Sequence, residues 1–248
     1  MRLLNTEFYK LRHKKVGFMV FLVGAFQFVY MIWATHTENS HFIGQEWKNC
    51  LYIMFLLNII IMPLLIAMIA SRISDIEHKG NNFKVLRTLV SESKLFNAKV
   101  LCGSIYLIES VSLQILTMVA VSRIQHFTEV MDVKHIIYYG LSVFVVDFAL
   151  LLLQFILALT FTNQMVGFIV ALAGTFLGLY SMFFGEQISR WILWGYYALI
   201  ASVRMEWSKA TGSVFYFISF PIQNIAIVGL MIGVLYVIGK RLFVKKEW

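Results

Sequence analysis

CLYIMFLLNIIIMPLLIAMIA, residues Cys50–Ala70, is a stretch of 21 residues without a charged side chain. A helix of about 20 apolar residues crosses the roughly 30 Å hydrocarbon core of a bilayer, so this stretch predicts a transmembrane helix. Comparable apolar runs recur along the chain. We therefore expect an all-α polytopic membrane protein with six transmembrane helices, at Val16–Ala34, Cys50–Ala70, Val100–Ser122, Ile136–Phe161, Met165–Phe184 and Val214–Gly239.

The composition agrees with a membrane protein and indicates its orientation. Hydrophobic residues make up 60% of the chain and charged residues 14%, whereas soluble domains have about 45–50% and about 25%. The net charge of +8 does not indicate a nucleic-acid partner, because the basic residues cluster at the ends of apolar runs. Of the 21 Lys and Arg residues, fifteen flank the N-terminus, the 71–99 connection and the C-terminus. The positive-inside rule therefore predicts that both termini are cytoplasmic.

The N-terminal residues 1–15 have the pattern of an amphipathic helix. Leu4, Phe8 and Leu11 recur at helical spacing, and basic residues lie between them. Such a segment lies in the headgroup layer of the inner leaflet, where lipid phosphates attract its cations. We expect an interfacial elbow helix; the alternative is a flank that only sets the topology.

The 71–99 connection is the long loop on the predicted cytoplasmic side. After the Gly80-Asn81-Asn82 break, Phe83, Leu86 and Val90 fall on one face of a short helix, and Ser91 can cap the next helix. An apolar face held away from the membrane suggests a docking element for a soluble partner. A solvated loop is the alternative.

The predicted outer segment 185–213 is rich in aromatic residues, among them Trp191 and Trp194. Aromatic rings favour the headgroup level, which two short, half-inserted helices would satisfy. The segment would be either an outer gate over a pathway or an interfacial anchor.

Two polar or small-residue patterns lie inside predicted spans. A stripe of small residues in the fifth span allows another helix to approach closely, either within the chain or in a dimer. Buried acids are costly in a membrane, so they indicate a proton pathway or a protonated acid hydrogen-bonded between helices. The stripe is Gly167, Ala171, Gly174 and Gly178, and the intramembrane polar residues are Glu109, Asp147 and Gln154.

Sequence motifs of catalysis are missing. The chain has no G-x-x-x-x-G-K-[ST] phosphate loop, no H-E-x-x-H zinc motif and no Gly-flanked serine elbow. We therefore expect a non-catalytic chain that binds no metal or cofactor, and we disfavour an intramembrane enzyme.

The whole chain resembles the permease subunit of a type-2 ABC exporter: an elbow helix, six spans, a long first cytoplasmic loop and an outer helical hairpin follow in that order. The sharpest match begins at Glu77, continues through Gly80-Asn81-Asn82-Phe83 and ends at Asn97-Ala98-Lys99. The family usually has Thr where Asn82 stands and Pro where Val90 stands.

This resemblance implies a partner. The 71–99 loop would dock on a separate cytoplasmic ATPase, which holds the ATP and Mg, and a second permease would complete a homodimer or heterodimer. The coupling residues would be Glu77, Phe83, Leu86, Arg87 and Val90.

The resemblance also implies a pathway and a substrate class. The second and fifth spans would line the pathway, with Asn58 and Pro63 on the second span. The Trp191–Gly195 stretch resembles small Gram-positive permeases for amphipathic peptides, such as exporters of phenol-soluble modulins and lantibiotic self-protection transporters. We expect a bacterial cell-membrane protein that expels such peptides. The alternative is a stand-alone, proton-coupled secondary transporter using Glu109 and Asp147.

Overall fold

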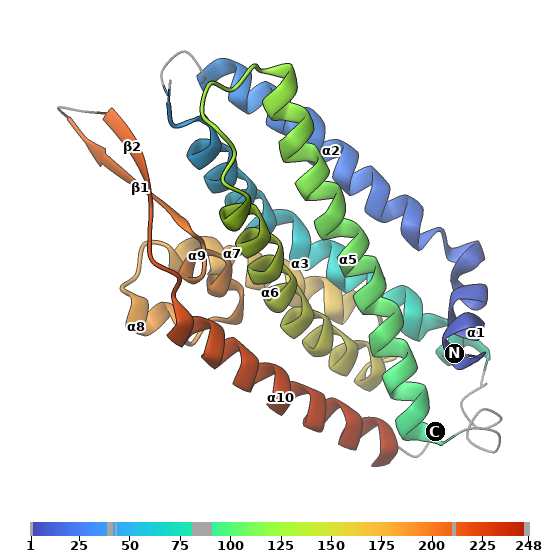
Figure 1. Ribbon diagram of the computed structural model, residues 1–248. Helices are drawn as coiled ribbons and strands as arrows, with labels where there is room; N and C mark the ends of the chain where they lie inside the picture. Colours follow the sequence, from blue (N-terminus) through green and yellow to red (C-terminus); the bar gives the residue numbers. More distant parts are fainter. Residues whose placement is uncertain (1, 39–41, 43, 81–90, 210–211, 246–248) are drawn as a thin grey trace.

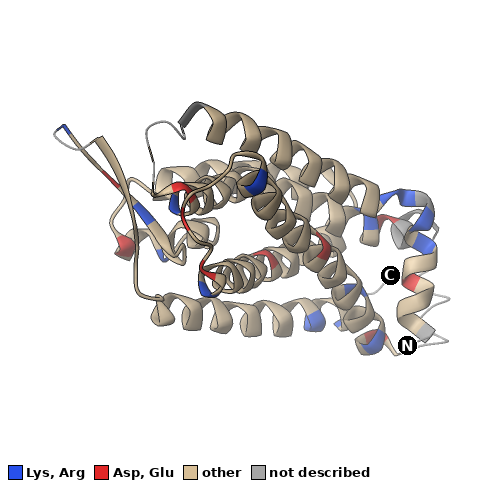
Figure 2. Cartoon of the chain, turned by 45° about the horizontal axis from the view of Figure 1, so that its top comes forward, with Lys and Arg blue, Asp and Glu red and all other residues tan. Residues whose placement is uncertain are grey.

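The computed structural model describes residues 2–38, 42, 44–80, 91–209 and 212–245. Long helices run side by side in a bundle (Figure 1). Both chain ends lie at one end of this bundle, called here the terminal end, and a β-hairpin lies at the opposite end, the hairpin end. Most charged residues lie toward these two ends (Figure 2).

The long helices follow the predicted spans. Among the described residues, α2 (Val16–Glu38), α3 (Glu46–Gly80), α5 (Glu92–Ile124), α6 (Val133–Thr160) and α10 (Ile222–Lys245) are long and apolar enough to cross a membrane. A further apolar helix, α7 (Met165–Ser181), has 17 residues. The structure therefore confirms a mainly helical chain with five candidate spans, and a sixth span through α7 stays a prediction.

The helices α3 and α5 extend well beyond the predicted spans. With 35 residues, α3 is ~52 Å long, more than a bilayer core requires. Its last turns and the first turns of α5 take up much of the segment that we expected to be a loop, 71–99. Ser91 is the N-cap of α5, as its position in the sequence predicted, although its side chain makes no capping hydrogen bond.

The hairpin end differs from the predicted pair of helices. Residues 185–213 begin with short helices, α8 (Glu186–Ser189), η2 (Leu193–Gly195) and α9 (Tyr196–Leu199). They continue into an antiparallel hairpin of β1 (Val203–Ser208) and β2 (Gly212–Phe217). The expectation of a wholly helical outer segment was therefore wrong at Val203–Ser208 and Gly212–Phe217, although the chain is mainly helical.

The sixth long helix consequently begins later than predicted. The apolar run from Val214 includes β2, whose β-branched and aromatic residues suit a strand. Pro221 lies just before α10, where a missing N–H costs no helical hydrogen bond. The helix therefore begins at Ile222, not at Val214.

The middle of the bundle is formed by α3, which contacts α2, α5, α6 and α7. At the edges, α2 and α10 leave large apolar side chains exposed, including Phe26 and Leu230. In a membrane protein such side chains face lipid. At the terminal end, α1 (Arg2–Leu11) and the single turn η1 (Arg12–Lys14) lead into α2, with Lys15 in a left-handed conformation at the turn.

Candidate functional site

A buried ion pair connects α1 to the start of α5 at the terminal end. Lys99 Nζ lies 3.1 Å from Glu7 Oε2, and the side chains of Lys99 and Glu7 are 1% and 2% exposed. The same ammonium donates to the carbonyl oxygen of Ile73 on α3 at 3.3 Å. Lys10 contacts the other Glu7 oxygen at 2.7 Å. One carboxylate and one ammonium therefore hold three helices together.

The electrostatics of this ion pair favour the ionised carboxylate. Burial alone would raise the pKa of the Glu7 carboxyl. The charges of Lys99 and Lys10 and their hydrogen bonds outweigh burial, so the pKa lies below its usual value of 4.5. Glu7 is therefore charged at neutral pH.

A second ion pair connects the α1 region to the end of α3. Lys14 in η1 lies 3.4 Å from Asp75 Oδ2. Asp75 precedes residues 81–90, and Lys99 follows them. The N-terminal region thus holds both flanks of this segment, and we call Glu7–Lys99 and Lys14–Asp75 the basal ion pairs. Aromatic contact between Phe8 and Tyr106, with ring centroids 5.8 Å apart, adds an apolar attachment.

The predicted coupling residues come between these two flanks in the sequence. Phe83, Leu86, Arg87 and Val90 fall outside the described residues. Glu77 lies in the last turns of α3, and its side chain is likewise outside the described part of the chain.

In the middle of the bundle, a polar network connects four helices. Asn58 on α3 donates to Gln114 Oε1 on α5 at 3.1 Å and to the Tyr139 hydroxyl on α6 at 2.9 Å. Gln27 on α2 donates to Asn58 Oδ1 at 3.3 Å, and Tyr139 donates to Gln114. Asn58 is thus buried among its neighbours and fixes how the helices pack. Pro63 is buried one turn further along α3.

The predicted intramembrane acids lie in separate places. Asp147 is fully buried on α6 and accepts a hydrogen bond from the Tyr197 hydroxyl on α9. Glu109 is half-buried on α5 and faces Gly17 at the start of α2. Gln154 lies beside Gly167 on α7. The contacts of these residues involve different helices, and no proton path joining Glu109 to Asp147 follows from them.

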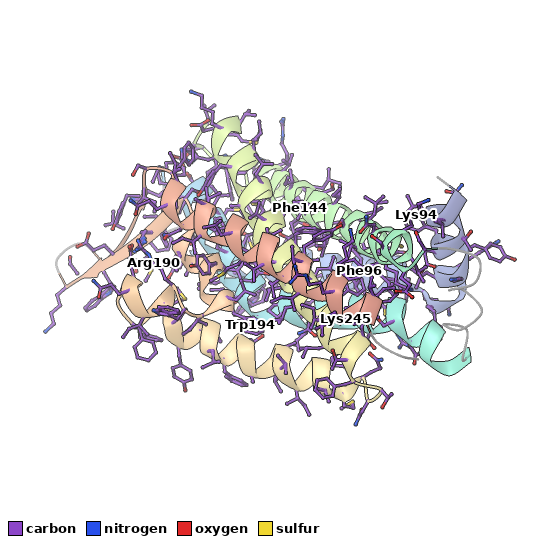
Figure 3. All side chains as sticks on the ribbon, turned by 90° about the horizontal axis from the view of Figure 1, so that it is seen from below. Lys94, Phe96, Phe144, Arg190, Trp194 and Lys245 are labelled. Carbon is purple, nitrogen blue, oxygen red and sulfur yellow. The ribbon has the colours of Figure 1, made fainter. Side chains whose placement is uncertain are left out.

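The small-residue stripe on α7 receives an aromatic ring from the same chain. A Cβ atom on Gly174 would lie 2.0 Å from Cε2 of Trp194, and one on Gly178 would lie 3.0 Å from Trp194 Cβ and 3.1 Å from Ile59. Ala171 on the same stripe is fully buried. Trp194 therefore lies between α7 and the rest of the bundle (Figure 3), whereas Trp191 is 88% exposed.

Two adjoining clefts lie along α3 near the hairpin end. Their volumes are 710 and 520 Å³, and both are lined by Tyr52, Leu56, Leu179 and Met205. The larger cleft runs between α3, α7 and the segment 186–199, and the smaller one reaches α2. Their walls are mainly apolar, with Glu186 and Arg204 at one edge. The arrangement suits a ligand with a large apolar surface.

A comparison with known families identifies the class of membrane protein to which these long apolar helices belong. A model described as "ABC-2 family transporter protein" matches residues 3–178, well over half of the chain. The chain belongs to the ABC-2 transporter family. It is therefore a multi-pass membrane permease subunit of an ABC transporter, and the family implies a cytoplasmic ATPase as its partner. No curated protein matches the chain, so the family model carries this assignment.

Several residues that organise this ABC-2 permease were missed in the sequence. Gln27, Gln114 and Tyr139 lie on three different apolar helices, and nothing in their spacing indicated that they meet. Glu7 and Lys99 are 92 positions apart. The resemblance to type-2 ABC permeases gave Asn58 as a pathway residue, and it gave none of the hydrogen-bond partners of Asn58.

Proposed function

We propose that this ABC-2 permease exports amphipathic peptides, with both termini in the cytoplasm and six spans including α7. Two permeases, identical or related, would enclose the pathway, and ATP hydrolysis on the partner ATPase would drive it. The single observation that carries the substrate class is the pair of apolar clefts along α3 and α7. An amphipathic peptide can place its apolar face there while its polar face meets the charged edge at Glu186 and Arg204.

The basal ion pairs support a route for coupling. In the proposed orientation, residues 81–90 contact the ATPase through Phe83, Leu86, Arg87 and Val90, with Glu77 at the flank. A displacement of residues 81–90 by the ATPase would be transmitted directly to α3 and α5. It would be transmitted to α1 through the Lys14–Asp75 and Glu7–Lys99 ion pairs. The three helices would then move together, because the buried Glu7–Lys99 pair resists separation of its charges.

The peptide assignment can be tested by ATP hydrolysis. The permease, purified with its ATPase in lipid nanodiscs, should hydrolyse ATP faster when an amphipathic helical peptide is added. Leu179→Trp, which narrows both clefts, should reduce this stimulation and leave basal hydrolysis unchanged. Leu230→Trp on the exposed face of α10 is the matched control and should behave as the wild type. Equal stimulation in Leu179→Trp and wild type would contradict the clefts as the peptide site.

A further inference from the structure

A further cleft of 610 Å³ opens at the hairpin end and shares Glu186 and Arg204 with the larger α3–α7 cleft. It lies between α8, the two strands and the first turn of α10, and its polar lining is formed by Glu186, Arg190, Arg204, Ser219, Gln223 and Asn224. Figure 3 shows Arg190 beside the hairpin, near the start of α10. The peptide proposal uses only the shared edge at Glu186 and Arg204 and not the rest of this cleft.

Two guanidinium groups line the cleft, and one carboxylate lies between them. Arg204 Nη2 lies 2.9 Å from Glu186 Oε1, and Arg190 Nη2 lies 3.7 Å from Glu186 Oε2. The Nε–H of Arg190 is buried and has no hydrogen-bond partner among the described residues. The Tyr196 hydroxyl donates a hydrogen bond to the backbone carbonyl oxygen of Arg190 at 2.9 Å. The cleft therefore keeps a net positive charge and unused donors.

Asn224 supplies a hydrogen-bond acceptor to the same cleft. Its side chain is 4% exposed, and its Nδ2 donates to the carbonyl oxygen of Leu199 at 3.2 Å. Because that bond identifies the nitrogen, the remaining atom is the oxygen Oδ1, which is buried and has no partner in the described part of the chain. An orphaned buried acceptor requires a donor from a ligand or solvent. The N–H groups in the first turn of α10 add further donors for an anion.

The position of the cleft indicates where such a ligand comes from. It lies at the start of α10, a candidate membrane span, and is bordered by Phe220 and Ile222, which are 45% and 75% exposed. Exposed apolar side chains at the end of a span lie at the level of lipid headgroups. We propose that this cleft binds the headgroup of an anionic phospholipid whose phosphate ester is accompanied by a hydroxyl group.

In this assignment each polar group has a role. Arg190 and Arg204 donate to the phosphate oxygens, and Asn224 Oδ1 accepts from the headgroup hydroxyl. Glu186 competes with the phosphate for both guanidinium groups. Removing the Glu186 charge should therefore strengthen binding, whereas removing the arginines should weaken it. A purely structural role of the ion pairs would not produce these opposite signs.

Binding to the full-length permease in detergent provides the test. The probes are dihexanoyl phosphatidylglycerol, dihexanoyl phosphatidylcholine and glycerol phosphate, measured by calorimetry. We expect phosphatidylglycerol to bind more tightly than phosphatidylcholine, whose headgroup has no hydroxyl donor. Arg190→Gln with Arg204→Gln should weaken phosphatidylglycerol binding at least roughly tenfold, and Glu186→Gln should strengthen it about threefold. Arg123→Gln, an exposed cation on α5 outside the cleft, is the control and should change nothing.

Three outcomes would overturn the proposal. The first is equal binding of phosphatidylglycerol by wild type and the double arginine variant, provided thermal unfolding shows both folded. The second is weaker binding in Glu186→Gln. The third is glycerol phosphate binding as tightly as the lipid, which would make the cleft a site for a soluble phosphate ester.

Discussion

The single side chain of Lys99 connects three helices at the terminal end. It contacts Glu7 on α1 and the backbone of α3 while belonging to α5. We predict that Lys99→Met destabilises the permease by up to about 3 kcal/mol, because Glu7 keeps Lys10 but loses its fully buried partner. Thermal unfolding in detergent measures this. Lys94→Met, on the exposed face of the same helix, should have little effect, and equal losses in both variants would contradict the assignment.

The lowered pKa of Glu7 predicts that the stability of the permease falls at acid pH. The folded-state pKa lies below 4.5, so the stabilisation is fully present above that value. It is lost as the pH falls through the folded-state pKa. Unfolding temperatures from pH 7 down to acid should therefore fall more steeply below about pH 4.5 in the wild type than in Glu7→Gln. Parallel curves for the two proteins would contradict this contribution of Glu7.

A substitution at Gly174 tests whether the Trp194 ring lies against α7. A methyl group at this position would meet the indole ring at 2.0 Å, so Gly174→Ala should displace Trp194 and cost about 1–3 kcal/mol. Gly229→Ala on α10 is the matched control, because nothing lies within 4 Å of its added Cβ. Tryptophan fluorescence and thermal unfolding report the two effects. If Gly174→Ala changed neither the fluorescence nor the unfolding temperature, the small-residue stripe on α7 would contact something other than Trp194.

At the scale of elements, the segment 186–199 is attached to the bundle by a few defined bonds. Tyr197 donates to Asp147, Asn224 donates to Leu199, and Tyr138 donates to the carbonyl oxygen of Ile200 at 2.8 Å. The α3–α7 clefts have this segment as one wall. Its attachment therefore decides the shape of the proposed peptide site.

The Tyr197–Asp147 bond allows a direct test of that attachment. Tyr197→Phe leaves the Asp147 carboxyl without its hydroxyl donor in an apolar region, so we expect faster hydrogen exchange in residues 186–199 and weaker peptide stimulation of ATP hydrolysis. Asp147→Asn keeps an oxygen acceptor for Tyr197 and should behave more like the wild type. If Asp147→Asn abolished transport while Tyr197→Phe did not, Asp147 would have a role beyond anchoring.

The sequence predicts the ends of helices correctly where an apolar run begins or ends at the helix boundary. The starts of α2, α6 and α7 fall close to the predicted spans because solvation of the apolar run sets them. The β-hairpin was missed because Val214–Phe217 is apolar enough to resemble the beginning of a helix. Its pairing with Val203–Glu206 depends on a partner strand that a hydropathy run does not reveal. Trp194 and the α7 stripe were both recognised, but not that they contact each other.

In the whole molecule, the basal ion pairs connect the N-terminal region to α3 and α5, the two helices that precede and follow residues 81–90 in the sequence. Membership of the ABC-2 family implies a cytoplasmic ATPase partner. We predict that Leu86→Pro or Arg87→Glu separates ATP hydrolysis from transport while the thermal unfolding of the permease is unchanged. Arg123→Glu, near the hairpin end, is the charge-reversal control. Coupled transport in both coupling variants would contradict the assignment of residues 81–90.

We propose that this permease moves amphipathic peptides by using ATP hydrolysed on a separate subunit. The most direct measurement reconstitutes the permease with its ATPase in inside-out vesicles and follows a fluorescent amphipathic peptide. We predict accumulation of the peptide in the lumen with ATP, and none with a non-hydrolysable analogue or in permease-free vesicles. Peptide accumulation driven by a proton gradient without ATP, or no accumulation with ATP, would contradict the account.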